Sequence, residues 1–168
     1  MFLDISQALR TANSEVPFQV SEVLEMQEIY GQQITFDDVS IQGTFSCVDD
    51  QENILLCGTM QTVTHARCAK CLEDASYPID LSFREMFVKD ADPDDPDAEA
   101  FAYRGHTISL EGFATALLIP ELPMRFLCKE DCKGLCPACG ANLNLGGCNC
   151  GAAGKDNPFA ALQQLFND

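Results

Sequence analysis

The chain has 168 residues, 46% of them hydrophobic, which suits one globular domain or one domain with a small appended module. No run of about 18 apolar residues is present, so the sequence excludes a transmembrane helix and predicts no membrane contact. Acidic residues outnumber Lys and Arg by 26 to 10, for a formal net charge of −16. This charge would repel nucleic-acid phosphates over most of the surface, and it favours a basic protein as partner.

The charge is unevenly distributed along the chain. Residues 1–119 hold 21 acids and 6 bases, whereas residues 120–168 hold 5 and 4. The first ten residues, MFLDISQALR, have neither the basic region nor the apolar core of a signal peptide. We therefore expect a cytoplasmic protein whose cysteines are reduced rather than paired as disulfides.

The first half of the chain predicts a short helix followed by antiparallel strands. Residues 4–10 have the pattern of a helix capped by Asp4, and a strand is expected to start at Phe18. Apolar residues alternate with polar ones over 39–47 and again over 54–67, with a polar turn at 49–53 between them. The two runs predict an antiparallel hairpin.

A third strand and a helix are predicted next. Ile79, Leu81, Phe83 and Phe87 share one parity, which indicates a strand that extends the hairpin into a meander. Residues 90–99 contain six acids and two prolines and predict a solvated loop, without the spacing of a calcium-binding loop. A short strand over 106–109 should lead into a helix over 109–119, capped by Ser109 and stopped by Pro120 and Pro123. Its apolar stripe consists of Leu110, Phe113, Ala114, Leu117 and Leu118.

Together these elements predict an α+β fold. Its body, residues 1–123, should be an antiparallel β-meander or partly closed sheet with a packed helix. Residues 124–168 should form a small zinc-binding module and a terminal helix. That helix is expected to begin with Asn157 as N-cap and Pro158 at the first position, after a flexible linker over 151–154.

Eight of the ten cysteines occur in closely spaced pairs, which we call hooks because such a pair can bend round one metal ion. The four hooks are Cys68/Cys71, Cys128/Cys132, Cys136/Cys139 and Cys148/Cys150. Zinc prefers four soft ligands at tetrahedral corners, and two hooks supply them. Gly140, directly after Cys139, suits the tight closing turn. Cys47 and Cys57 lack this spacing and are expected to be buried structural cysteines.

The hooks therefore predict two structural zinc ions. We expect Cys68/Cys71 to join Cys128/Cys132, which would clamp the cysteine-rich segment onto the meander. Cys136/Cys139 would then join Cys148/Cys150. Sequence order leaves a second pairing open, in which Cys128/Cys132 exchanges partners with a neighbouring hook. Disulfides or buried free thiols would compete with metal binding as explanations of the same cysteines.

The sequence does not favour an enzyme. It lacks a nucleophile elbow, a metalloprotease motif and a phosphate-binding glycine loop. All-cysteine ligand sets are typical of closed structural sites, whereas a catalytic zinc keeps one coordination position open. His65, three residues before Cys68, is interpreted as a histidine on a strand surface rather than a ligand.

The cysteine pattern resembles that of the YceD-like family, the large ribosomal RNA subunit accumulation proteins. The resemblance rests on Cys68-Ala-Lys-Cys71-Leu72, on the run from Leu127 to Asn144 with its Cys-Pro-Ala-Cys-Gly, on Cys148-Asn-Cys150, and on Asn157-Pro158-Phe159-Ala160. It extends from about Leu56 to Leu165. Lys70 stands where the family usually has Arg in the first hook.

The resemblance implies a cytoplasmic factor that supports 23S rRNA accumulation and large ribosomal subunit assembly. Because the body is acidic, we expect it to act through a basic large-subunit ribosomal protein or a pre-ribosomal particle, with weak or indirect rRNA contact. The sequence is also compatible with two different functions. One is a thiol-redox switch, and the second is a zinc-stapled adaptor unrelated to ribosomes.

Overall fold

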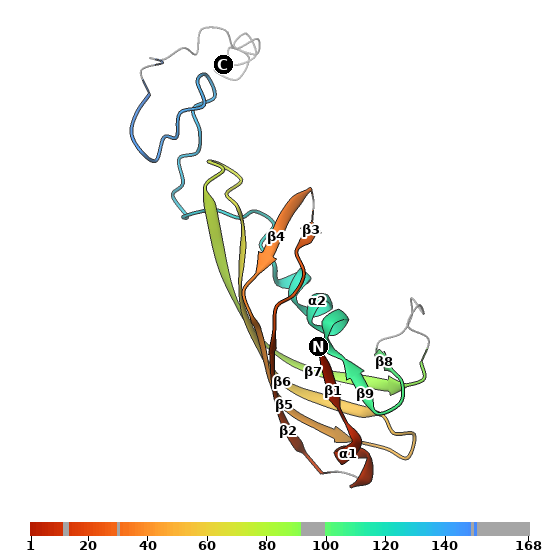
Figure 1. The fold of residues 1–168 in the computed structure, drawn as a ribbon. Helices are drawn as coiled ribbons and strands as arrows, with labels where there is room; N and C mark the ends of the chain where they lie inside the picture. Colours follow the sequence, from red (N-terminus) through yellow and green to blue (C-terminus); the bar gives the residue numbers. More distant parts are fainter. Residues whose placement is uncertain (12–13, 30, 92–99, 149, 151–168) are drawn as a thin grey trace, which may run out of the picture.

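The computed structural model describes residues 1–11, 14–29, 31–91, 100–148 and 150. Within them it contains one seven-stranded sheet, one two-stranded sheet and two helices (Figure 1). The elements are β1 (Phe2–Asp4), α1 (Ser6–Arg10), β2 (Val16–Glu22), β3 (Gln27–Ile29), β4 (Gln32–Phe36), β5 (Val39–Cys47), β6 (Ile54–Arg67), β7 (Asp74–Lys89), β8 (Phe101–Tyr103), β9 (Thr107–Ser109) and α2 (Leu110–Glu121). The α+β class and the mainly antiparallel sheet are as predicted.

The predicted hairpin is formed by β5 and β6. Its antiparallel register runs from Ser40 opposite Gln61 to Cys47 opposite Ile54. The strands approach each other closely where Gly43 faces Gly58, since a Cβ at Gly43 would lie 2.0 Å from the Cys57 carbonyl oxygen. A larger residue there would have to push the strands apart.

The predicted third strand is β7, and it is longer than its alternating stretch suggested. It pairs with β6 from Ile54 opposite Phe87 to Arg67 opposite Asp74, so the two strands form one long ribbon. Figure 1 shows this ribbon extending away from the rest of the sheet towards the cysteine-rich segment. The ribbon therefore places the first hook at the end of the molecule where the other hooks lie.

The strands at the edges of the sheet were largely missed by sequence analysis. The expected strand start at Phe18 corresponds to β2, which pairs with β5, but β3 and β4 were not predicted. β4 pairs with β6 beyond the stretch of β6 that pairs with β5, and β8 runs parallel to the end of β7. Among the described residues the pairing ends at β2, β3 and β8, so the sheet does not close on itself and the expected partial closure is not seen.

The first residues form a strand as well as the expected helix. β1 pairs with β9, and α1 begins only at Ser6. Asp4 lies in β1, yet its carboxylate still accepts a hydrogen bond from the Ser6 amide at 2.8 Å. The helix begins later than expected, its N-cap is Ile5 without a side-chain cap, and the prediction that Asp4 is the N-cap is therefore wrong.

Helix α2 packs against the main apolar face of the sheet. Leu110, Phe113, Ala114 and Leu118 are buried, as the predicted stripe requires, while Leu117 is half-buried. The Phe113 ring lies 5.1 Å from the rings of Phe83 and Phe101 and 5.3 Å from that of Phe87. These aromatic contacts fix the helix against β7 and β8.

The predicted end of α2 at residue 119 is slightly wrong. Pro120 lies inside the last turn, and the helix continues to Glu121. Pro120 has no amide hydrogen and so removes one helical hydrogen bond. Because the helix ends at the next residue, Glu121, this loss has little effect on it. In the described part of the chain neither helix has the length and apolar character that crossing a membrane requires.

Three predictions fall wholly or largely outside the described residues. They are the linker at 151–154, the terminal helix from Asn157, and most of the acidic loop, at 92–99. The boundary after residue 123 also remains a prediction.

Candidate metal centres

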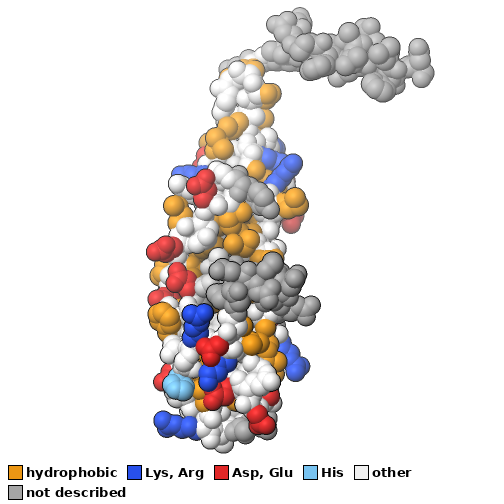
Figure 2. Space-filling view, turned by 90° about the vertical axis from the view of Figure 1, so that its right-hand side faces the viewer, with side chains coloured by type: hydrophobic (Ala, Val, Ile, Leu, Met, Phe, Trp, Pro, Cys, Tyr) orange, Lys and Arg blue, Asp and Glu red, His pale blue; other side chains and the backbone are white. Residues whose placement is uncertain are grey.

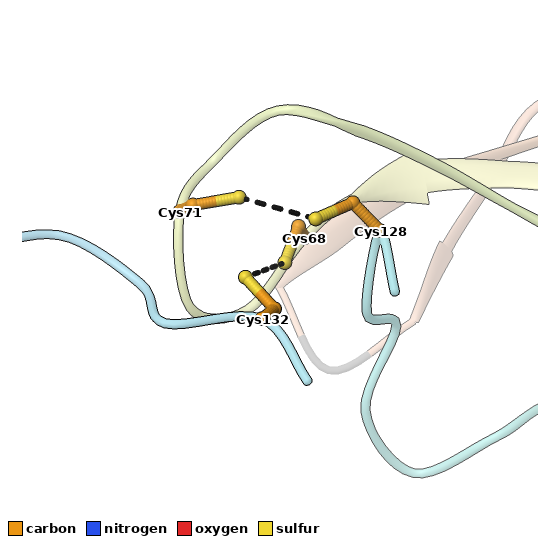
Figure 3. Close-up of side chains that lie close together, drawn as sticks. All are labelled: Cys68, Cys71, Cys128 and Cys132. Carbon is orange, nitrogen blue, oxygen red and sulfur yellow. Dashed lines mark hydrogen bonds between the residues drawn. The ribbon is translucent and has the colours of Figure 1, made fainter. Parts of the chain in front are cut away.

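The first group of four cysteines lies at the end of the β6–β7 ribbon. Cys68 and Cys71 belong to the turn between these strands, while Cys128 and Cys132 belong to the segment after α2. Figure 3 shows the four sulfur atoms pointing towards a common centre. The Sγ atoms of Cys68 and Cys132 are 3.8 Å apart, and those of Cys71 and Cys128 are 3.5 Å apart. We call this group the first tetrad.

Backbone hydrogen bonds hold the later segment against the first hook on both sides. The Ala69 amide donates to the Phe126 carbonyl at 2.8 Å, and the Leu135 amide donates to the Lys70 carbonyl at 3.1 Å. Phe126 is buried and joins the hydrophobic core. The first tetrad is therefore assembled from parts of the chain that are already docked before any ion is considered.

The second tetrad consists of Cys136, Cys139, Cys148 and Cys150, all from one short segment. The Sγ atoms of Cys136 and Cys148 are 3.3 Å apart. The Gly140 amide donates to the Cys136 carbonyl at 2.8 Å, which closes a tight turn around the hook. Gly140 has a φ of 72°, the left-handed conformation expected from the sequence. Cys136 is buried in this group, and Cys139 is exposed.

The first hook uses the same turn but places a leucine in the glycine position. The Leu72 amide donates to the Cys68 carbonyl at 2.9 Å, and Leu72 has a φ of 63°. The left-handed conformation costs an ordinary residue about 1–2 kcal/mol. The side chain is 62% exposed, so burial in the core does not offset this cost. Nothing in the sequence indicated the strained leucine.

Within each tetrad the thiols differ strongly in pKa. Burial acts to raise the pKa of Cys68, but backbone amides donate to its sulfur and lower that pKa to about 6. Its neighbour Cys128 has a pKa raised to about 12, first by its hydrogen bond with Cys71 and then by burial.

The second tetrad shows the same division. Backbone amides of Ala138 and Cys139 lower the pKa of Cys136 to about 6. The contact with Cys139 and burial raise the pKa of Cys150 to about 12. Four sulfurs so close together cannot all ionise without a positive charge among them. A divalent cation at the centre of each tetrad would remove this conflict.

The geometry of the two tetrads fits zinc. In a tetrahedral site with Zn–S bonds of about 2.3 Å, neighbouring sulfurs are about 3.8 Å apart. Within each tetrad all four sulfur atoms lie within 4.8 Å of one another, and the closest pairs are 3.3–3.8 Å apart. Small inward or outward shifts would convert either group into a four-thiolate site. Sulfur-only ligand sets of this shape select soft metals such as zinc.

The structure brings together the same two sets of four cysteines that sequence order favoured, and not the exchanged pairing. Among the other sequence candidates, His65 lies on β6 outside both tetrads, and its Nε2 is 3.0 Å from the Asp37 carboxylate. Cys47 is buried as predicted, and its thiol donates to the Asp49 carbonyl at 3.4 Å. Cys57 is only half-buried, because it lies on the opposite face of the β5–β6 hairpin from the core residues.

Sequence analysis missed one residue at the first tetrad. Asn144 donates a hydrogen bond from Nδ2 to the Cys132 sulfur at 3.3 Å, although it belongs to the loop of the second tetrad. Polar loop residues are common, and its contact depends on how the two tetrads sit against each other. No local signal could have identified it.

Comparison with known families assigns the chain to one of them. The model of the family described as "Large ribosomal RNA subunit accumulation protein YceD" matches residues 56–166, which is more than half of the chain. The chain belongs to this family. The matched region contains all eight tetrad cysteines and agrees closely with the range over which the resemblance was seen.

The relatives are matched over only part of their length. An uncharacterized protein of Mycobacterium tuberculosis is 34% identical over 95 residues, which cover 55% of this chain and 46% of that protein. An uncharacterized protein of Mycobacterium leprae is 30% identical over 96 residues, 55% of this chain and 44% of that protein.

A plant protein carries a functional name. It is the Arabidopsis thaliana "Large ribosomal RNA subunit accumulation protein YCED homolog 1, chloroplastic", which is 42% identical over 45 residues, 27% of this chain and 14% of that protein. The chain therefore spans less than half the length of each of these three relatives. No solved structure was found to match it.

Proposed function

We propose that this protein is a zinc-stapled, non-enzymatic factor that supports 23S rRNA accumulation and large ribosomal subunit assembly in the cytoplasm. The observation that carries the proposal is the family match over residues 56–166, whose description names large ribosomal RNA subunit accumulation. The same span contains both tetrads and nearly all of the β6–β7 ribbon. Both candidate metal sites and the ribbon that carries the first of them thus lie in the part of the chain that the family model matches.

Zinc in this proposal has a structural role. Each ion would take all four coordination positions from cysteine sulfur, with Cys68, Cys71, Cys128 and Cys132 at one site and Cys136, Cys139, Cys148 and Cys150 at the other. A site closed in this way leaves no position for a substrate or for an activated water. The ions would instead fix the cysteine-rich segment against the end of the ribbon. We therefore assign the protein a binding function rather than a catalytic one.

A basic large-subunit ribosomal protein is the partner that the charge favours. The net charge is −16, and on the face shown in Figure 2 the Lys and Arg side chains are scattered among acidic and hydrophobic ones. Attraction between an acidic body and a basic protein would speed their association and weaken as salt screens it.

The cations near the first tetrad do not form a strong RNA-binding patch. Lys70, Lys129 and Lys133 lie within or beside its hooks, but a zinc ion with four thiolates carries two negative charges that partly cancel them. Arg67 is already paired with Asp74 at 2.8 Å. Since RNA affinity depends mainly on the number of phosphates neutralised, we propose weak or indirect rRNA contact.

Genetic complementation tests this function. In the organism that encodes the protein, deletion of its gene should lower the ratio of 23S to 16S rRNA and reduce large subunits in a sucrose gradient. Wild-type protein should restore both, and the double variant Cys68→Ser/Cys71→Ser should not. Cys57→Ser is the matched control, because Cys57 lies outside both tetrads. An unchanged rRNA ratio in the deletion strain would contradict the proposal.

Pull-down from the same cells separates this function from a redox switch and from an unrelated adaptor. The proposal expects a basic large-subunit protein or a pre-ribosomal particle to copurify with the tagged chain. A thiol-redox switch would instead yield metal-free protein with reversibly oxidised cysteines. An adaptor unrelated to ribosomes would bind zinc but recover no ribosomal component.

A further inference from the structure

The side chain of Asn144 connects the loop of the second tetrad directly to a sulfur of the first tetrad. This residue lies in the loop between Cys139 and Cys148, so its backbone belongs to the second tetrad. Its Nδ2 nevertheless donates to the sulfur of Cys132 in the first tetrad at 3.3 Å. Its Oδ1 accepts a hydrogen bond from the Lys133 amide at 2.9 Å. One loop therefore supplies a hydrogen-bond donor to a ligand of the other site.

The orientation of the Asn144 amide is fixed by its neighbours. Besides Cys132, Nδ2 donates to the Asn142 Oδ1 at 2.9 Å, so both of its hydrogens are used. Reversing the amide would place Oδ1 against the Cys132 sulfur and the Asn142 oxygen, and Nδ2 against the Lys133 amide. The contacts with Asn142 and Lys133 would then be repulsive, as would the contact with the Cys132 thiolate, so only the observed orientation satisfies the network.

The loop that carries Asn144 is docked on the first tetrad by further contacts. The Asn142 Nδ2 donates to the Glu73 carboxylate at 3.2 Å, and Glu73 lies just after the first hook. The Leu143 amide donates to the Gly134 carbonyl at 2.9 Å. An ordinary turn would explain the hydrogen bonds within the loop, but it would not require a donor aimed at a sulfur of the neighbouring tetrad.

We propose that Asn144 is a positioning residue that makes metal binding at the two tetrads cooperative. A metal in the second tetrad closes the loop between Cys139 and Cys148 and thereby holds the Asn144 donor against Cys132. That hydrogen bond stabilises the Cys132 thiolate and so the metal of the first tetrad. A metal in the first tetrad in turn fixes the backbone around Lys133 on which the loop docks. Because coupling between two binding sites is reciprocal, each metal retains the other.

Site-resolved alkylation of the zinc-loaded protein measures this coupling. The protein is treated with iodoacetamide and a dilute chelator, and alkylation is followed peptide by peptide with mass spectrometry. Cys71 is the reporter for the first tetrad, because its sulfur contacts Cys128 while the Asn144 donor is directed at Cys132. Asn144→Leu removes the donor without adding charge. Leu145→Ala is the matched control, since the neighbouring Leu145 side chain is 85% exposed.

We expect Asn144→Leu to speed the alkylation of Cys71 about tenfold, the lower end of the range for loss of a partner that orients a metal ligand. Asn144→Asp keeps an acceptor for the Lys133 amide but sets a charged oxygen against the Cys132 sulfur, so it should speed the alkylation at least as much. Removing the second tetrad with Cys148→Ser/Cys150→Ser should expose Cys71 to the same extent. Adding Asn144→Leu to that variant should have no further effect, because both changes interrupt one connection.

Two results would overturn the inference. One is a Cys71 alkylation rate that is the same in Asn144→Leu, Leu145→Ala and wild type. The other is a full multiplication of the two effects in the combined variant, which would mean that the tetrads communicate by a route other than Asn144. The inference rests on the proposed metal binding, and the metal content of the wild type distinguishes the two failures. Fewer than two ions per chain would refute both the metal binding and the coupling. Two ions per chain with no effect of Asn144→Leu would refute only the coupling.

Discussion

Loss of the first hook should destabilise the whole body, whereas loss of a hook from the second tetrad should have a much smaller effect. The matched pair of variants is Cys68→Ser/Cys71→Ser and Cys148→Ser/Cys150→Ser, each of which removes one hook from one tetrad. The first tetrad joins Cys71 to Cys128, 57 residues apart in sequence, across the end of the main sheet. The second joins Cys136 to Cys148, which are only 12 residues apart in one segment.

The expected magnitudes follow from these separations. Treated as a cross-link that closes a loop of 57 residues, the first tetrad contributes about 4 kcal/mol to stability. For a protein of this size that corresponds to a decrease of about 8–16 °C in melting temperature. The second tetrad closes a local loop, so its loss should reach the body only through the proposed tenfold coupling. That coupling is worth about 1.4 kcal/mol, or about 3–6 °C.

The assay is thermal unfolding of the zinc-loaded proteins followed by circular dichroism and calorimetry. Wild-type protein stripped by a chelator is the control, and it should melt near the first-hook variant because both lack the long-range clamp. If Cys68→Ser/Cys71→Ser melts no earlier than Cys148→Ser/Cys150→Ser, the clamp is not what holds the segment to the sheet, and this reasoning is wrong.

Three further predictions concern the core, the strained turn and the charge. Phe113→Ala should lower the free energy of unfolding in urea by about 3–5 kcal/mol, because its buried ring contacts three other phenylalanines. The control Ile119→Ala, on the exposed side of α2, should lower it by less than about 1 kcal/mol, and equal losses would contradict the packing. Leu72→Gly should leave the melting temperature unchanged or raise it, because the left-handed turn favours glycine; a clear decrease would mean that the leucine has a packing role. Binding of a basic large-subunit protein, measured by titration calorimetry, should weaken strongly between about 50 and 500 mM NaCl, and salt-independent binding would rule out the electrostatic account.

The sequence predicted the parts of the fold in which local pattern and tertiary structure agree. Alternation over 39–47 and 54–67 identified β5 and β6 because one face of the hairpin is buried along its length. The cysteine spacing identified both tetrads, since each hook is a local turn whose geometry depends on few residues. The helical stripe led directly to the buried face of α2.

The remaining elements could not be predicted, because their pairing is decided by distant residues. β1, β3 and β8 have three residues each, too few for an alternating pattern to be recognised, whereas the short strand expected over 106–109 is present as β9. β8 pairs with β7 in parallel and does not continue the antiparallel meander. Leu72 and Asn144 were missed for a related reason. The first departs from the usual residue of its turn, and the second acts across two tetrads.

Metal content of freshly purified protein tests the central claim most directly. Protein prepared without added metal and without oxygen should be studied by native mass spectrometry and elemental analysis. The account predicts two zinc ions per chain, with one lost on removal of a single tetrad by Cys136→Ser/Cys139→Ser and neither lost in the control Cys57→Ser. One ion or none in the wild type, or cysteines recovered as disulfides in place of metal, would contradict it.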